Sequence, residues 1–197
     1  VNILLISLIK RMKLNINPFI FYKLFNSCFT GLSIGILFTI YEPIKPSIFS
    51  IGGIFLALGL LIIANYYEKL LNISKFFYIS IFVELFKLLS LILFFLLKYS
   101  IVSALLIYVI YQITFIFGGY LVRAETLVVK EKKLLSRIDI NKQVGYLIGL
   151  CLSLIFYKTM DLFFEITDKK VQITILHYLL LTLQIFVIYL LIKSFKK

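Results

Sequence analysis

The sequence predicts an all-α, polytopic membrane protein with six transmembrane helices and with both termini in the cytoplasm. Three observations lead to this prediction. Of the 197 residues, 62% are hydrophobic and 15% are charged, and the mean hydropathy is +1.06. Soluble domains have roughly a quarter of their residues charged, so lipid must cover part of this chain. Long apolar runs recur along the sequence, and basic residues gather between alternate runs.

A transmembrane helix needs about 20 mainly apolar residues to cross ~30 Å of hydrocarbon. Six stretches meet this requirement, and in chain order they are residues 19–41, 46–65, 76–97, 100–122, 140–157 and 172–192. The first and fifth each contain a GxxxG pattern, Gly31 with Gly35 and Gly145 with Gly149. Such small residues let helices approach closely, so we expect the first and fifth helices to be tightly packed.

The other spans differ in their polar content. The second has no charged residue, the third contains two charges, and the fourth and sixth each carry a glutamine, Gln112 and Gln184, near mid-span. The fifth is the least apolar because Lys142 and Gln143 lie near its start. We therefore divide the chain into a cytoplasmic or interfacial lead-in at 1–18, a six-helix bundle at 19–192 and a basic cytoplasmic tail at 193–197.

Lys and Arg are distributed unevenly between the two sides of this bundle. Fifteen of the 21 lie near the N-terminus, between helices two and three, between helices four and five, or after helix six, and five lie on the opposite side. Cytoplasmic loops carry the excess of positive charge. We therefore expect both termini in the cytoplasm and the protein in the inner membrane of the cell. The net charge of +12 then faces anionic lipid headgroups, and nucleic acid is not an expected partner.

The sequence offers little for enzymatic chemistry. It has one histidine, His177, and two cysteines, Cys28 and Cys151, which lie in different spans. Zinc sites gather three or four His, Cys or carboxylate ligands, and the sequence shows no such group. Motifs for a nucleophilic serine, a metalloprotease helix or a phosphate-binding loop are absent from it. We therefore expect no enzymatic activity, no metal and no cofactor.

Glu84 and Lys87 lie inside the third apolar run, in the stretch FVELFKLL. At 1.5 Å per residue from Phe76, they are about 12 and 16 Å deep, close to the bilayer midplane. Their spacing of three residues places them on one helix face, where they can pair. An unpaired charge at this depth costs several kcal/mol, so such residues face the protein interior or water. Two interpretations stay open, an internal clamp or a place on a transport pathway.

The connection between helices two and three reads ALGLLIIANYYEKLLNISKFF. This stretch resembles the loop GxxxDRxGRRxx of the major facilitator superfamily. Ala64 takes the first glycine position, Glu68 the acidic position and Lys69 the basic position, whereas Leu71 and Asn72 depart from the pattern.

The fourth span ends in GGYLVRAE, where Glu125 takes the place of an acidic residue that pairs with this loop in the family. The resemblance therefore implies a cytoplasmic charge cluster of Glu68, Lys69, Arg123 and Glu125. The following stretch, NKQVGYLIGLCLS, carries glycines like the family's fifth helix and lacks the proline of its antiporter signature.

The resemblance covers about residues 20–192, which corresponds to one six-helix half of a twelve-helix fold. In that family, helices one and four of each half line a solute cavity between the halves. The implied cavity residues are Tyr22, Asn26, Thr30, Tyr111, Gln112 and Thr114. The resemblance thus implies secondary transport of a small solute. It also implies a homodimer, a separately encoded partner half, or a shortened gene product.

Two other classes of protein remain open. The substrate-capture subunits of energy-coupling-factor vitamin importers also have six helices and present small residues of helix one to a partner. Gly31 and Gly35 suit that role. A membrane scaffold without transport activity is the third interpretation.

Overall fold

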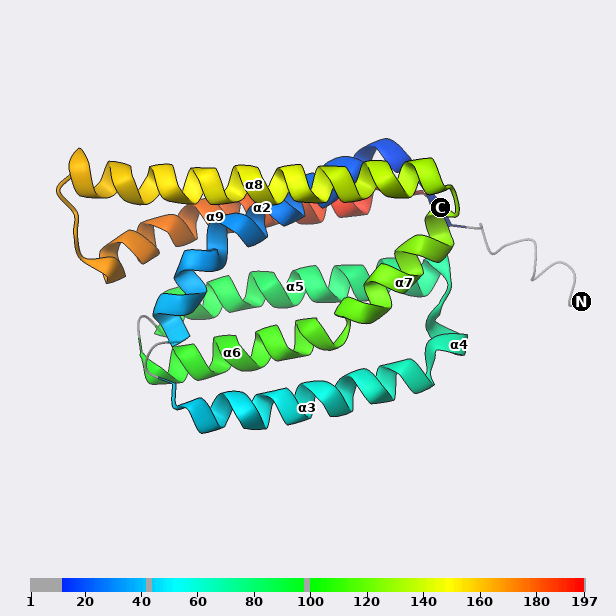
Figure 1. Cartoon of the computed structure of the whole chain (residues 1–197), viewed down its shortest axis with the longest axis horizontal. Coiled ribbons are helices and arrows are strands. Elements are labelled where there is room, and N and C mark those ends of the chain that lie inside the picture. Colours follow the sequence, from blue (N-terminus) through cyan, green and yellow to red (C-terminus); the bar gives the residue numbers. More distant parts are fainter. Residues whose placement is uncertain (1–11, 42–43, 98–99, 197) are drawn as a thin grey trace, which may run out of the picture.

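The computed structural model describes residues 12–41, 44–97 and 100–196, except for the side chains at 38, 39 and 41 (Figure 1). Six helical segments in this part of the chain are long and apolar enough to cross a membrane. This confirms the predicted all-α architecture of a multi-pass membrane protein. The elements are β1 (Lys13–Leu14), α2 (Ile16–Tyr41), α3 (Pro46–Asn65), α4 (Tyr67–Leu70), α5 (Ile73–Leu97), α6 (Ile101–Ile116), α7 (Gly118–Val129), α8 (Lys132–Leu162), α9 (Lys169–Lys193) and β2 (Phe195–Lys196).

Local sequence explains where several helices begin. Pro46 opens α3, at a position where its missing N–H removes no intrahelical hydrogen bond. The Ser100 hydroxyl accepts a hydrogen bond from the Ser103 N–H at 3.1 Å, which caps α6. The Asp168 carboxylate likewise accepts one from the Lys170 N–H at 2.8 Å and caps α9.

The fourth span differs from the predicted 100–122 because it continues to Val129 and is broken in the middle. α6 ends at Ile116, and α7 resumes at Gly118 after the single residue Phe117. Paired glycines follow the break, and glycine is the least favourable helix former after proline. The break thus has a local cause, and it divides the span into two helices.

The predicted boundaries of the lead-in, the tail and the fifth span also need correction. The first helix begins at Ile16, so the end of the expected lead-in is already helical, and residues 1–11 lie outside the described part. The fifth helix runs from Lys132 to Leu162, well beyond the predicted 140–157. The last helix reaches Lys193, and Lys197 lies outside the described residues.

The two ends of the described chain meet. β1 and β2 pair antiparallel, and the Asn15 N–H donates to the Ser194 carbonyl at 2.7 Å. In Figure 1 the C-terminus, α4 and the α7–α8 turn lie at one end of the bundle. We call this the terminal end, and the end with the α5–α6 and α8–α9 turns the opposite end.

The helices pack in two groups. The first group is α2, α8 and α9, in which α2 packs against the other two. The second group is α3, α5, α6 and α7, in which α6 packs against α3 and α5. α5 and α9 join the groups. Figure 1 shows α8 and α9 above α5, α6 and α3, with α2 and α7 crossing between these levels. The packing repeats between spans one to three and spans four to six. α2 packs on α8 as α6 packs on α3, α2 packs on α9 as α6 packs on α5, and the contact of α5 with α9 relates the third spans of the two sets.

Glycines bring α2 and α8 together, as their GxxxG patterns predicted. A Cβ atom at Gly31 would overlap the Tyr146 carbonyl, and one at Gly149 would overlap the Cys28 carbonyl. The two backbones are therefore in direct contact. Since Gly31 already packs on α8, this face of α2 is not free for a partner protein.

Candidate functional site

Glu84 lies at the centre of a buried polar network between the two groups. Its side chain is 1% exposed, and its Oε2 atom lies 2.6 Å from Lys87 Nζ. The Tyr22 hydroxyl donates to Oε1 at 2.7 Å. The Gln184 amide donates to Oε2 and to the Glu84 carbonyl, both at 2.9 Å. The carboxylate is thus held by one cation and two uncharged donors.

Lys87 connects the network back to α2. Its Nζ donates to Asn26 Oδ1 at 2.5 Å and lies 5.6 Å from the centre of the Phe29 ring. The pairing predicted from the spacing of Glu84 and Lys87 is present, but the pair is also bonded to two neighbouring helices. This geometry favours the interpretation as an internal clamp.

Glu125, on α7, is the centre of a second network nearer the terminal end. Its side chain is 4% exposed, with Lys23 Nζ 2.5 Å from Oε2 and Lys142 Nζ 2.5 Å from Oε1. Lys142 also lies 3.0 Å from Asp139 Oδ1, at the surface of α8. α2, α7 and α8 therefore meet at one carboxylate.

Both carboxylates join the two helix groups. Glu84 and Glu125 belong to the second group. The partners that the first group contributes to them are Tyr22, Lys23, Lys142 and Gln184. Such buried ion pairs and hydrogen bonds fix the relative position of the groups, since breaking one leaves a charge or donor unpaired.

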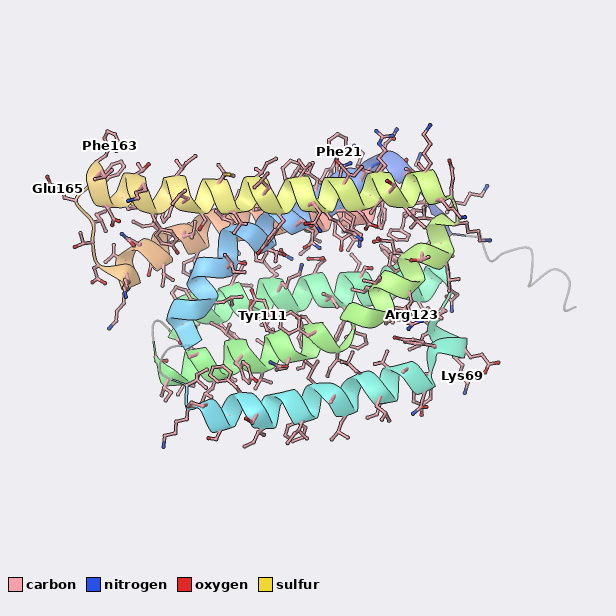
Figure 2. All side chains as sticks on the ribbon, in the orientation of Figure 1. Phe21, Lys69, Tyr111, Arg123, Phe163 and Glu165 are labelled. Atoms are coloured by element: carbon pink, nitrogen blue, oxygen red, sulfur yellow. The ribbon has the colours of Figure 1, made fainter. Side chains whose placement is uncertain are left out.

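The charge cluster implied by the family loop differs from the ion pairs that the structure shows. Glu125 pairs with Lys23 and Lys142, and no ion pair among the described residues involves Glu68, Lys69 or Arg123. Glu68 and Lys69 are exposed on α4, and Figure 2 shows Lys69 at the outer edge of the molecule. The Arg123 guanidinium instead lies over the Tyr67 ring at 5.6 Å. Residues 123 and 125 are two apart on one helix, so their side chains leave it in nearly opposite directions.

The six implied cavity residues are found in different environments. Tyr22 and Thr114 are buried, and the Thr114 hydroxyl donates to the Tyr111 carbonyl of its own helix. Both therefore differ from the expectation that they line an open cavity. Asn26, Tyr111 and Gln112 are partly exposed and Thr30 is exposed. The Gln112 side-chain oxygen is buried without a hydrogen-bond partner.

One face of α2 carries a row of polar side chains that the described chain leaves partly open. We call it the polar stripe, and it consists of Lys23, Asn26, Ser27 and Thr30. Thr30 is exposed and the other three are partly exposed. Successive members of the stripe are three or four residues apart along the helix. This spacing keeps all four on one helix face. The stripe extends along roughly 10 Å of the helix axis.

An apolar groove lies on the other side of α2, between α8 and α9. It has a volume of about 770 Å³, and its lining includes Leu24, Phe25 and Cys28 of α2, Leu152 of α8 and Phe186 of α9. The lining is almost entirely apolar, so membrane hydrocarbon can fill it. It offers few groups that could recognise a polar solute.

The histidine packs among aromatic side chains, and the two cysteines lie on different helices. His177 is buried, stacks on Phe94 with ring centres 3.7 Å apart, and shares a hydrogen bond with the Ile173 carbonyl at 2.8 Å. Cys28 is buried and Cys151 exposed, each as a free thiol. In the described part of the chain, no three His, Cys, Asp or Glu side chains gather as metal ligands would.

Sequence reasoning missed the roles of Lys23 and Lys142. The charge distribution counts both with the basic residues of the cytoplasmic side, near the starts of the predicted spans 19–41 and 140–157, whereas the structure pairs both with Glu125. A signal was present, because each lysine lies two to three turns inside a membrane-spanning helix. A lysine at that depth requires an acidic partner on another helix.

No protein-family model, curated protein or solved structure matches the chain. The functional interpretation therefore depends on the packing of the helices and on the charges between them.

Proposed function

We propose that this multi-pass membrane protein is a secondary transporter of a small solute, built like one six-helix half of a major facilitator. The polar stripe of α2 is the observation that carries the proposal. Lys23 and Asn26 each have a partner inside the protein, yet both remain partly exposed beside Ser27 and Thr30. Lipid cannot hydrate the exposed part of such a polar helix face, which therefore requires water or another protein surface. A water-filled solute pathway supplies that environment.

The packing of the helices supports the same function. The contacts of spans one to three correspond to those of spans four to six. Corresponding spans, such as one and four, cross the membrane in opposite directions. Inverted repeats of three helices occur within each half of major facilitators, and their solute sites lie near mid-membrane at the repeat interface. In this chain Gln184 of span six donates to Glu84 of span three, so the Glu84 network contains a contact between the two repeats. The break at Phe117 is of the kind that transporter helices use at such sites.

A second six-helix unit would complete the pathway by covering the polar stripe. That unit is a second copy of this chain or a separate half. The capture-subunit alternative is less well supported, because α8 already occupies the side of α2 that carries Gly31.

Thiol accessibility tests the pathway without knowledge of the solute. In a background with Cys28→Ala and Cys151→Ala, Ser27→Cys and Thr30→Cys should react with a membrane-impermeant, charged thiol reagent. Leu58→Cys, on the exposed side of α3, is the matched lipid-facing control and should stay unmodified. Equal protection of all three positions would contradict a water-filled pathway.

We further propose that the terminal end faces the cytoplasm of a cell whose inner membrane holds the protein. The basis is the excess of Lys and Arg in the loops at that end. Reporter fusions after Glu68 and Lys133 should report cytoplasm, and fusions after Lys45 and Asp168 should report the outside. The reverse pattern would show that the terminal end faces the outside.

A further inference from the structure

The Glu125 cluster contains more buried positive charge than negative charge. Glu125 supplies one carboxylate, whereas Lys23 and Lys142 each bring an ammonium group to 2.5 Å from it. Asp139 contacts Lys142, but its side chain is 69% exposed, so solvent screens much of its charge. By contrast, Lys87 balances Glu84 one for one. One lysine near Glu125 is therefore left without a buried counter-ion.

Lys23 is the lysine in surplus. Its ammonium group has three N–H donors, and in the described part of the chain its one carboxylate contact is with Glu125. The same nitrogen lies 5.1 Å from the centre of the Phe19 ring and 5.4 Å from that of Tyr22. Aromatic faces attract a cation but do not neutralise its charge. Lys23 thus keeps donors and charge available for an anion.

The two ammonium groups lie on the two oxygens of one carboxylate. Because each contacts an oxygen of the same carboxylate, a small oxyanion can reach both. Their side chains remain 12% and 23% exposed, so the cluster is not sealed. Lys23 also forms the terminal end of the polar stripe, which connects the cluster to the proposed pathway.

The surface near the cluster attracts anions. The α7–α8 turn and the start of α8 carry four exposed basic residues and two exposed acids, namely Lys130, Lys132, Lys133, Arg137, Glu131 and Asp139. A surface with a charge of one sign raises the local concentration of the opposite ion.

We propose that Lys23 and Lys142 bind a small oxyanion, a carboxylate or phosphate group, at the terminal end of the polar stripe. Its oxygens accept hydrogen bonds from the free donors of Lys23 and neutralise the surplus charge. The group belongs to a soluble solute or to a lipid headgroup. For a soluble solute, the inference rests on the proposed function and names the transported class, a small anion.

The first experiment measures the Tm of the purified full chain in a neutral detergent, with sodium phosphate against sodium chloride at equal ionic strength. Phosphate should raise the Tm in a concentration-dependent way, since a ligand that binds the folded state stabilises it. The rise should be lost in Lys23→Gln and retained in the matched control Lys158→Gln, an exposed lysine of α8 that lies away from this basic surface. Lys23→Gln should still fold, because Glu125 keeps Lys142.

The second experiment separates the two sources of the anion. Nanodiscs of phosphatidylglycerol are compared with nanodiscs of phosphatidylcholine, for the wild type and both variants. A rise with phosphatidylglycerol alone, lost in Lys23→Gln, supports the site with a lipid headgroup as its ligand. A rise with inorganic phosphate supports it with a soluble anion.

Direct binding of radiolabelled phosphate to the wild type gives a readout that does not depend on how the variants fold. The proposal is overturned when neither phosphate nor phosphatidylglycerol binds, or when Lys23→Gln keeps the full response. Thiol accessibility of Thr30→Cys requires no anion, so the pathway and the anion site can fail independently.

Discussion

Glu84 and Glu125 are both buried carboxylates that the second helix group presents to the first, yet they are neutralised differently. Glu84 has one lysine from its own helix, and its other donors, Tyr22 and Gln184, are uncharged. Glu125 has two lysines, both supplied by the first group. The Glu84 network is therefore balanced in charge, whereas the Glu125 cluster carries a surplus charge.

Depth in the membrane explains the difference. Glu84 lies near the middle of α5, too far from either end for a side chain to reach water, so its charge must be matched inside the protein. Glu125 lies one turn from the end of α7, where long lysine side chains can extend toward the interface. A second lysine is tolerated there. We infer that Glu84 holds the groups together, whereas the surroundings of Glu125 can respond to a ligand.

The largest expected effect is that of Lys87→Met, which leaves Glu84 without a cation. Breaking a buried pair in this way costs about 3–5 kcal/mol. The Tm in detergent and the amount of protein in the membrane should both fall. A stable but inactive Lys87→Met protein would contradict the clamp and place the pair on the solute pathway.

Removing both charges of that pair refines the same test. Glu84→Leu with Lys87→Leu should recover only part of the stability, because Tyr22 then loses its acceptor. An unpaired buried hydroxyl costs about 1–3 kcal/mol. Adding Tyr22→Phe should therefore raise the Tm further.

Glu125→Gln should have the next largest effect, because two neighbouring lysines lose their shared carboxylate. We expect a loss of about 2–3 kcal/mol, below the cost at Lys87, since these lysines can shift toward the interface. Detergent-induced unfolding would measure it. Glu131→Gln, an exposed residue next to α8, is the matched control and should be silent. A larger loss for Glu125→Gln than for Lys87→Met would reverse the comparison.

Gly149→Ala should disturb the Glu125 cluster and leave the Glu84 network in place. Its Cβ would overlap the Cys28 carbonyl, so α8 must move away from α2 at a cost of about 1–3 kcal/mol. Lys142 moves with α8, whereas the partners of Glu84 lie on α2, α5 and α9. The phosphate response should therefore weaken. Gly53→Ala, where an added Cβ meets nothing within 4 Å, is the control for Tm.

Lys23→Gln should have the smallest effect on stability, less than about 1 kcal/mol, because Glu125 keeps one lysine and gains an amide donor. Lys87→Gln is the informative companion variant, since the same chemical change there leaves Glu84 unbalanced. Equal losses of Tm in the two variants would show that Lys23 is not in surplus.

The two networks also differ in how far the sequence could predict them. Glu84 and Lys87 are three apart on one helix, so helical geometry alone places them together. The lysines of Glu125 come from other helices, and Lys142 is 17 residues away along the chain. Arg123, the near neighbour in sequence, leaves α7 on another side and contacts Tyr67. Closeness in sequence therefore predicted the Glu84–Lys87 pair correctly, but it predicted the wrong partner, Arg123, for Glu125.

The sequence by itself determined the number of spans, their approximate positions and the tight packing of helices one and five. These properties depend on local hydrophobicity, on the thickness of the hydrocarbon layer and on small residues at helical spacing. Only the tertiary structure decided how α2, α8 and α9 separate from the other helices, and which lysines Glu125 receives. Those outcomes depend on how each helix is rotated and tilted against its neighbours. Rotation and tilt follow from packing across the whole bundle, which no single stretch of sequence contains.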